Sequence, residues 1–117
     1  MHRDMKPQNI MLDSDYNVKI IDFGDARYVN EEPEAQEELA EGEMPQGIPQ
    51  GRRDTFVGTV NYQSPEVVNG EDQGFAVDIW ALGNVLFKMY TGYVPFKGTN
   101  PHTVYKDIKS RNIGWPD

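Results

Sequence analysis

The sequence predicts a mainly α-helical, α+β fold in which helices accompany one short β-hairpin. Two short apolar runs, 10–12 and 18–21, flank residues with turn chemistry, which indicates a hairpin. A long apolar segment over 76–91 ends at Gly92, a residue type that commonly stops helices. A further helical segment begins at Pro101, because proline fits the first helical position. At 117 residues the chain is long enough for one small domain.

The hairpin follows from the residues between its two strands. Asp and Asn side chains within 13–17 can bond their own backbone and close a turn. The turn brings residues 2–9 and 22–24 to the same end of the hairpin. Residues 26–29 allow one more short strand.

The helices follow from start and stop signals. Ser64 offers a capping hydroxyl before a proline, which predicts a short helix to about Val68. The helix over 76–91 carries apolar residues on nearly all sides, a pattern typical of a helix at the centre of a larger body. Asn100 is a candidate cap for a last helix, expected over 101–112.

Composition excludes several classes of function. The net charge of -8, from 11 basic and 19 acidic residues, argues against binding to nucleic acid or an anionic membrane. With no cysteine, the chain has no disulfide, no thiolate nucleophile and no cysteine-based zinc site. It shows no signal peptide and no apolar segment long enough to span a bilayer. We therefore expect a cytoplasmic protein, whose recruitment to a membrane would need parts outside these residues.

A strongly acidic segment interrupts the pattern of helices and strands. Seven glutamates occur within residues 31–43, and the wider stretch 30–54 has few apolar side chains. Such composition cannot offset the entropy cost of ordering, so we expect a mobile loop, with order resuming near Phe56. Glu34 to Ala40 has weak helical potential. A flexible spacer, an autoinhibitory pseudo-substrate and a docking tail all remain open as roles for this insert.

Two short strings carry distinctive residue types. Residues 2–9 read His-Arg-Asp-Met-Lys-Pro-Gln-Asn, and residues 22–24 read Asp-Phe-Gly. They match H-R-D-x-K-P-x-N followed by D-F-G, and Ser-Pro-Glu follows at 64–66. The chain therefore resembles the eukaryotic protein kinase family over essentially its full length. The lysine at position 6 resembles the serine/threonine branch of that family.

The chemistry of phosphoryl transfer explains these residue types. The reaction needs a carboxylate to orient the acceptor hydroxyl, a cation near the phosphate and hard oxygen ligands for Mg²⁺. Asp4 is the candidate carboxylate, and Lys6 is the candidate cation. Asn9 and Asp22 are the candidate metal ligands, so Lys6, Asn9 and Asp22 together would hold ATP and Mg²⁺. Gly24 allows a tight turn behind Asp22.

The resemblance also implies a domain plan. It identifies the chain as part of the large lobe of a kinase, with the nucleotide-binding lobe absent. Residues 1–29 would hold the catalytic loop, the hairpin and the metal-binding loop, and 30–66 the activation segment with its acidic insert. Residues 67–117 would hold the central helix and the helix after it. Residues 55–66 and 78–83 are similar to the phosphoinositide-dependent group of AGC-like kinases.

Several supporting residues are assigned by resemblance alone. Thr59, within Gly-Thr-x-x-Tyr at 58–62, matches a substrate-docking loop in which the threonine hydroxyl bridges the catalytic aspartate and lysine. Asp78 matches a residue that bonds the backbone of the catalytic loop, although a carboxylate favoured by the helix dipole is an alternative. His2 and Phe23 match two stacked spine residues. The arginine that pairs with Glu66 in the family has no counterpart here.

Thr55 occupies the place of the family's activating phosphate. A phosphate there would add nearly two negative charges close to Arg3. An upstream kinase or autophosphorylation would then order the loop through a phosphate–arginine pair.

The chain lacks the family's glycine-rich loop and its V-A-I-K lysine. We therefore expect this chain to be inactive by itself and to expose apolar surface on the hairpin and the long helix. Its function in a complete domain would be ATP-dependent phosphorylation of serine or threonine in a protein substrate. The alternative is a truncated, non-catalytic protein that binds kinase substrates or regulators through the docking loop and the last helix.

Overall fold

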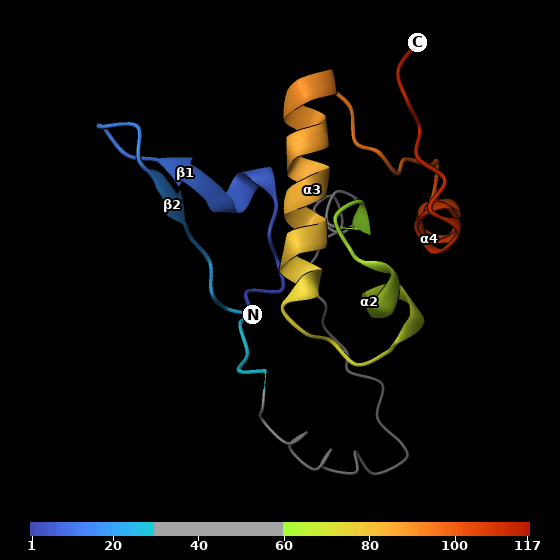
Figure 1. Ribbon diagram of the computed structural model, residues 1–117, viewed down its shortest axis with the longest axis horizontal. Helices are drawn as coiled ribbons and strands as arrows, with labels where there is room; N and C mark the ends of the chain where they lie inside the picture. The colour runs from blue at the N-terminus through green and yellow to red at the C-terminus, as the bar shows by residue number, and fades with distance from the viewer. Residues whose placement is uncertain (30–59) are drawn as a thin grey trace, which may run out of the picture.

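The computed structural model describes residues 1–29 and 60–117, and the statements below concern those residues. As predicted, the fold is rich in helix and contains one two-stranded antiparallel sheet. In Figure 1, α3 stands at the centre, with the hairpin on one side and α2 and α4 on the other. The elements are a 3₁₀ turn η1 (Pro7–Asn9), strands β1 (Ile10–Leu12) and β2 (Val18–Ile20), and helices α2 (Pro65–Asn69), α3 (Ala76–Thr91) and α4 (Pro101–Ser110).

The predicted hairpin is confirmed, with Ile10 opposite Ile20 in its register. Its turn is built around Asp13, whose Oδ1 accepts hydrogen bonds from the backbone N–H groups of Asp15 and Asn17, each at 2.9 Å. The bonds from Asn17, backbone first and then side chain, hold the pKa of Asp13 below its ordinary value. The turn expected for residues 13–17 is therefore closed by hydrogen bonds from backbone N–H groups to the Asp13 carboxylate.

The prediction of a further strand over residues 26–29 is wrong. Ala26 donates its N–H to the carbonyl of Phe23 at 3.1 Å, which reverses the chain directly after the hairpin. Arg27 then exchanges two hydrogen bonds with Met1, at 3.0 Å and 2.7 Å. Because the segment pairs with a single residue, no strand develops.

Helix α3 has the predicted limits, and Gly92 ends it with a left-handed φ of +80°. One side of α3 is buried against the loops before and after it. A first core cluster contains Met5, Tyr62, Ala81 and Val85, and a second contains Val60, Phe96, Val104 and Ile108. Trp80 stacks on Phe96 with ring centroids 5.5 Å apart, which joins α3 to the second cluster. Burial raises the pKa of the Tyr62 phenol.

The two shorter helices begin at their predicted prolines, and α2 ends at Asn69, close to the expected end near Val68. The Ser64 hydroxyl is buried and makes no hydrogen bond with any described residue, so its predicted capping role is wrong. Asn100 does cap α4, since its Oδ1 accepts the N–H of Thr103 at 2.9 Å. Helix α4 ends at Ser110, earlier than predicted, because Arg111 takes a left-handed φ of +53°.

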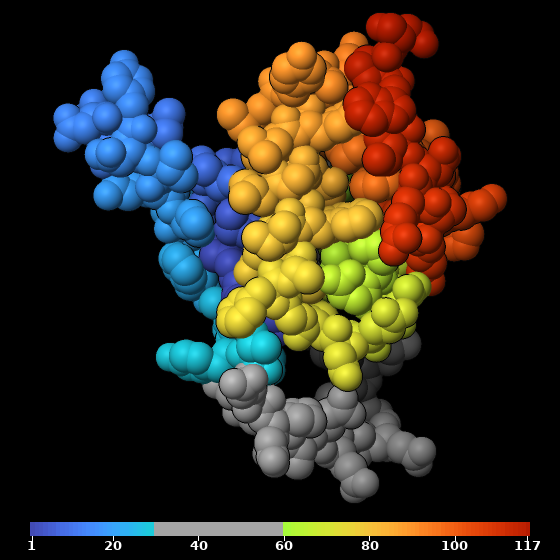
Figure 2. Space-filling model, in the orientation of Figure 1, coloured from blue at the N-terminus to red at the C-terminus, as the bar shows by residue number. Residues whose placement is uncertain are grey.

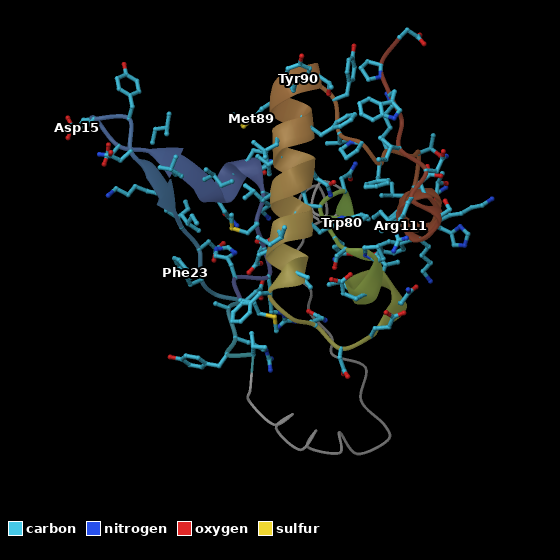
Figure 3. The ribbon with its side chains drawn as sticks, viewed as in Figure 1. Asp15, Phe23, Trp80, Met89, Tyr90 and Arg111 are labelled. Carbon is cyan, nitrogen blue, oxygen red and sulfur yellow. The ribbon has the colours of Figure 1, made fainter. Side chains whose placement is uncertain are left out.

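The side of α3 opposite the core carries exposed apolar residues, as does the hairpin. Ile79 is 69% exposed, Leu86 57% and Met89 76%. Figure 2 shows the hairpin projecting from the body of the molecule, and Figure 3 shows Met89 and Tyr90 at the end of α3 far from α2. The expectation of exposed apolar surface on these two elements is confirmed. Among the described helices, none has both the length and the hydropathy needed to cross a membrane.

Candidate active site

The three polar residues singled out in the first loop lie together. The Asp4 carboxylate contacts the Lys6 ammonium at 3.1 Å, and the two side chains are only 14% and 16% exposed. The Asn9 amide donates to Asp4 Oδ2 at 3.0 Å and to the Asp4 carbonyl at 2.8 Å. Asn9 can reach both atoms because η1 turns the chain back on itself after Pro7. A carboxylate, a cation and an amide thus share one small volume.

Asp78 anchors this loop from the first turn of α3. Its Oδ2 accepts the backbone N–H of His2 at 2.7 Å, and its Oδ1 accepts that of Arg3 at 2.8 Å. Arg3 has a φ of +73°, a region that non-glycine residues rarely adopt. The two charge-assisted bonds therefore help to hold a strained backbone immediately before Asp4.

His2 links the first loop to the end of β2. Its Nδ1 accepts the N–H of Asp4 at 3.2 Å, so its Nε2 carries the proton and donates to the Ile21 carbonyl at 2.9 Å. Its ring also meets the Phe23 ring edge-on, with centroids 5.0 Å apart. The N–H of Ile21 in turn donates to the Asn9 carbonyl at 3.0 Å. These contacts fix the two loops relative to one another.

Asp22 itself, and not Gly24, has the unusual backbone. Asp22 has a φ of +61°, and its Oδ1 accepts the N–H of Gly24 at 3.3 Å. A Cβ at position 24 would lie 3.2 Å from that oxygen, closer than most real contacts. Glycine is therefore explained by the close approach of the Asp22 carboxylate. The expected tight turn behind Asp22 is confirmed, since the Ala26 N–H donates to the Phe23 carbonyl across Gly24 and Asp25.

The residues present fit a magnesium ion. Asn9 and Asp22 offer an amide oxygen and a carboxylate, the hard oxygen donors that Mg²⁺ prefers. Mg²⁺ commonly takes only one or two protein ligands and completes its shell with water and phosphate oxygens. The described residues contain no group of three or more His, Cys, Asp and Glu that could form a cage around a metal. Two oxygen donors of this kind are compatible with an ion that takes its remaining ligands from outside the chain.

A cavity of about 250 Å³ borders Asp4 and Arg3. Its other walls include Asp25, Tyr62 and Gln73, none of which is a predicted site residue. Gln73 comes from the loop before α3, and no motif marks it. Tyr62 was named only as part of the docking-loop pattern, and its position in the core explains its presence in the wall.

Two asparagines outside the predicted site also connect core segments, and of these Asn84 is buried and Asn61 is partly buried. The Asn84 amide donates to the Asn61 carbonyl at 3.2 Å, and the Asn61 amide donates to the Phe96 carbonyl at 2.7 Å. These bonds connect the middle of α3 to the loops on both sides of it. A polar residue inside an apolar helix was the signal available for Asn84.

The remaining predicted residues divide into two groups. Glu66 lies in the first turn of α2 and borders a cavity with Arg111, but it makes no ion pair with a described residue. Thr55 and Thr59 lie outside the described residues, as do the acidic insert 30–54 and the weak helical segment within it. Only the Arg3 half of the Arg3–Thr55 pair can therefore be placed.

Comparisons with known proteins identify the family of the chain. The protein kinase domain family matches residues 1–114. The serine/threonine-protein kinase ksg1 of Schizosaccharomyces pombe is 41% identical over 108 residues, which cover 92% of this chain and 18% of that protein. The 3-phosphoinositide-dependent protein kinase 1 of Arabidopsis thaliana is 36% identical, over 100% of this chain and 22% of that protein. The serine/threonine-protein kinase PDK1 of Cryptococcus neoformans is 36% identical, over 99% and 8%.

These relatives confirm the resemblance stated from the motifs, including its phosphoinositide-dependent group. The chain spans less than a quarter of the length of each of these three relatives. The relatives therefore show the family of the chain and not the activity of a whole protein. With the family match over nearly all of its residues and relatives that are named serine/threonine kinases, the chain belongs to the protein kinase domain family.

Proposed function

We propose that the chain forms part of the large lobe of a serine/threonine protein kinase domain, which transfers the γ-phosphoryl group of ATP to protein hydroxyls. One observation supports this most directly. Asp4 is held by Lys6 and Asn9 in a loop that is bonded to the residue preceding Asp22. The domain plan of 1–29, 30–66 and 67–117 belongs to the same proposal.

Each residue has a role that its chemistry allows. Asp4 orients the serine or threonine hydroxyl of the protein substrate and accepts its proton at the carboxylate. Lys6, next to that carboxylate, places positive charge where the transferred phosphoryl group is most negative. Thr59 supports the bound substrate through its hydroxyl. Asp78, His2 and Phe23 keep the loops in position.

Asn9 and Asp22 would hold Mg²⁺ through oxygen atoms. The bound ion would neutralise charge on the phosphate oxygens of ATP. The chain contributes the placement of those two ligands, since His2 and the Ile21–Asn9 bond connect the segments that carry them.

The first test replaces Asp4 with Asn in the full-length protein. The substitution retains the shape of the side chain and removes the base, so we expect kcat on a protein substrate to fall by about 10²- to 10⁴-fold. Phosphate transfer is measured with radiolabelled ATP, and circular dichroism checks the fold.

Asp15→Asn is the matched control, since Asp15 lies exposed at the tip of the hairpin (Figure 3). It should leave kcat unchanged. An Asp4→Asn protein with the full rate would contradict the assignment of Asp4. Wild-type full-length protein that transfers no phosphate at all would favour the alternative of a non-catalytic binding module.

A second proposal concerns regulation. A phosphate on Thr55, added by an upstream kinase or by autophosphorylation, would pair with the exposed Arg3 guanidinium. Such a pair would order the activation segment. Thr55→Ala should therefore lower the rate of phosphate transfer. Mass spectrometry of active wild-type protein should detect a phosphate on Thr55. Active protein that carries no phosphate at Thr55 would contradict the proposal.

A further inference from the structure

An open groove of about 560 Å³ lies between α2 and the exposed face of α4. This volume lies within the range of sites that bind small ligands or a few side chains. The neighbouring residue of α2, Val67, lines the cavity beside Asp4, so α2 separates the groove from the candidate active site. The groove is lined by Val68 from α2 and by His102, Tyr105, Lys106, Lys109 and Ser110 from α4.

The groove is basic although the chain as a whole is acidic. His102, Lys106 and Lys109 follow a helical spacing of four and three residues, which places them on one face of α4. All three side chains are exposed, and neither lysine forms an ion pair with a described carboxylate. Asp107, the one acidic residue of α4, is absent from the lining and instead accepts the amide of Asn112 at 3.2 Å. No acidic side chain of α4 therefore neutralises the lysines that line the groove.

The floor of the groove is partly apolar. Val68 and Tyr105 are half-buried and pack against the second core cluster, so they form a fixed wall. A fixed apolar wall beside two lysines complements an acidic peptide that carries an apolar side chain.

A membrane is a poorer match for the same surface. The apolar residues of α4, Val104 and Ile108, are 1% and 0% exposed, so the helix offers no apolar face for insertion between lipids. A concave surface with three basic side chains also presents less charge to a flat bilayer than a basic tract would.

We infer that the groove between α2 and α4 binds an acidic segment of a protein partner, with the basic side chains on its carboxylates and an apolar residue against Val68 and Tyr105. This goes beyond the proposed catalytic function and does not require it. A partner bound there would lie across α2 from Asp4.

Fluorescence anisotropy on the full-length protein tests the inference. The probe is a fluorescein-labelled peptide, Glu-Glu-Phe-Glu-Glu, and its lysine counterpart, Lys-Lys-Phe-Lys-Lys, is the reference. We expect the acidic peptide to bind more tightly, and its affinity to fall as salt is raised. Lys106→Glu should weaken binding about fivefold, and the pair Lys106→Glu with Lys109→Glu should weaken it further.

Lys88→Glu is the matched control, because it makes the same change of charge at an exposed lysine of α3. It should leave the affinity unchanged. Asp4→Asn should also bind the peptide normally, which separates failure of this inference from failure of the catalytic proposal. The inference is overturned if Lys88→Glu weakens binding as much as Lys106→Glu, or if the two peptides bind equally. It is also overturned if Lys106 is needed for binding to phosphatidylserine vesicles and not to the peptide.

Discussion

Arg3 and Asp22 both adopt left-handed backbone conformations on either side of the candidate active site, with φ of +73° and +61°. A non-glycine residue in this region costs about 1–2 kcal/mol, so other contacts must offset the strain. At Arg3 the offsetting contact comes from Asp78, which accepts both neighbouring N–H groups. At Asp22 the side chain accepts the N–H of Gly24. Strain at these positions is balanced by carboxylates.

Asp78→Asn should therefore weaken the first loop. An amide presents one oxygen in place of two, so one N–H loses its acceptor and can face a donor instead. We expect a loss of about 1–2 kcal/mol in the free energy of unfolding of the domain and a lower kcat. Denaturant unfolding and steady-state kinetics on the full-length protein measure the two effects.

The control for this substitution is Asp72→Asn, at an exposed carboxylate in the loop before α3. It should change neither stability nor rate. If Asp78→Asn behaved like Asp72→Asn, the bonds to His2 and Arg3 would not hold the loop.

Helix α3 has two different faces. Val77, Ala81, Asn84 and Val85 are buried against the core, whereas the opposite face exposes a stripe at alternating spacings of four and three residues. Such a stripe is the pattern by which a helix packs along a partner, and a contiguous apolar patch in water favours association. The stripe consists of Phe75 at the N-cap and of Ile79, Leu82, Leu86 and Met89 within the helix.

The 117-residue chain should consequently self-associate through this stripe. Leu86→Lys with Met89→Lys should shift it toward the monomer in sedimentation velocity and lower its binding of a hydrophobic dye. Because both side chains are more than half exposed, the stability cost should stay within about 0.5 kcal/mol. Two lysines placed at exposed sites of α4, Ser110→Lys with His102→Lys, are the control. Equal effects from both pairs would point to net charge and not to the stripe.

The ends of the helices show how far element-level signals extend. Asn100, Pro101 and Gly92 act within their own turns, and each does what its residue type predicts. Ser64 has the same local signature, yet its hydroxyl is buried without a described partner. At Ser64 tertiary packing decides the outcome. The residue is only 1% exposed, and its buried hydroxyl does not bond the first turn of α2.

At the scale of the whole molecule, long-range contacts build the site. His2 and Arg3 bond to Asp78, which lies more than seventy positions away. The central position of α3 in Figure 1 allows one helix to anchor the loop that carries Asp4 at its first turn and both core clusters along its length. The same packing of α2 beside α4 creates the basic groove.

The sequence by itself determined the family, the hairpin and the limits of α3, and it predicted the candidate site residues, because those signals act within a few residues of one another. The predicted turn brings residues 2–9 and 22–24 to one end of the hairpin, whereas the contacts of Asp4 with Lys6 and Asn9 came only from the folded chain. Tertiary structure alone decided the pairing of Arg27 with Met1, the burial of Ser64, the bond between Asn61 and Asn84, and the groove. These features depend on which segments pack together after the chain folds, and no local pattern of residue types records that packing.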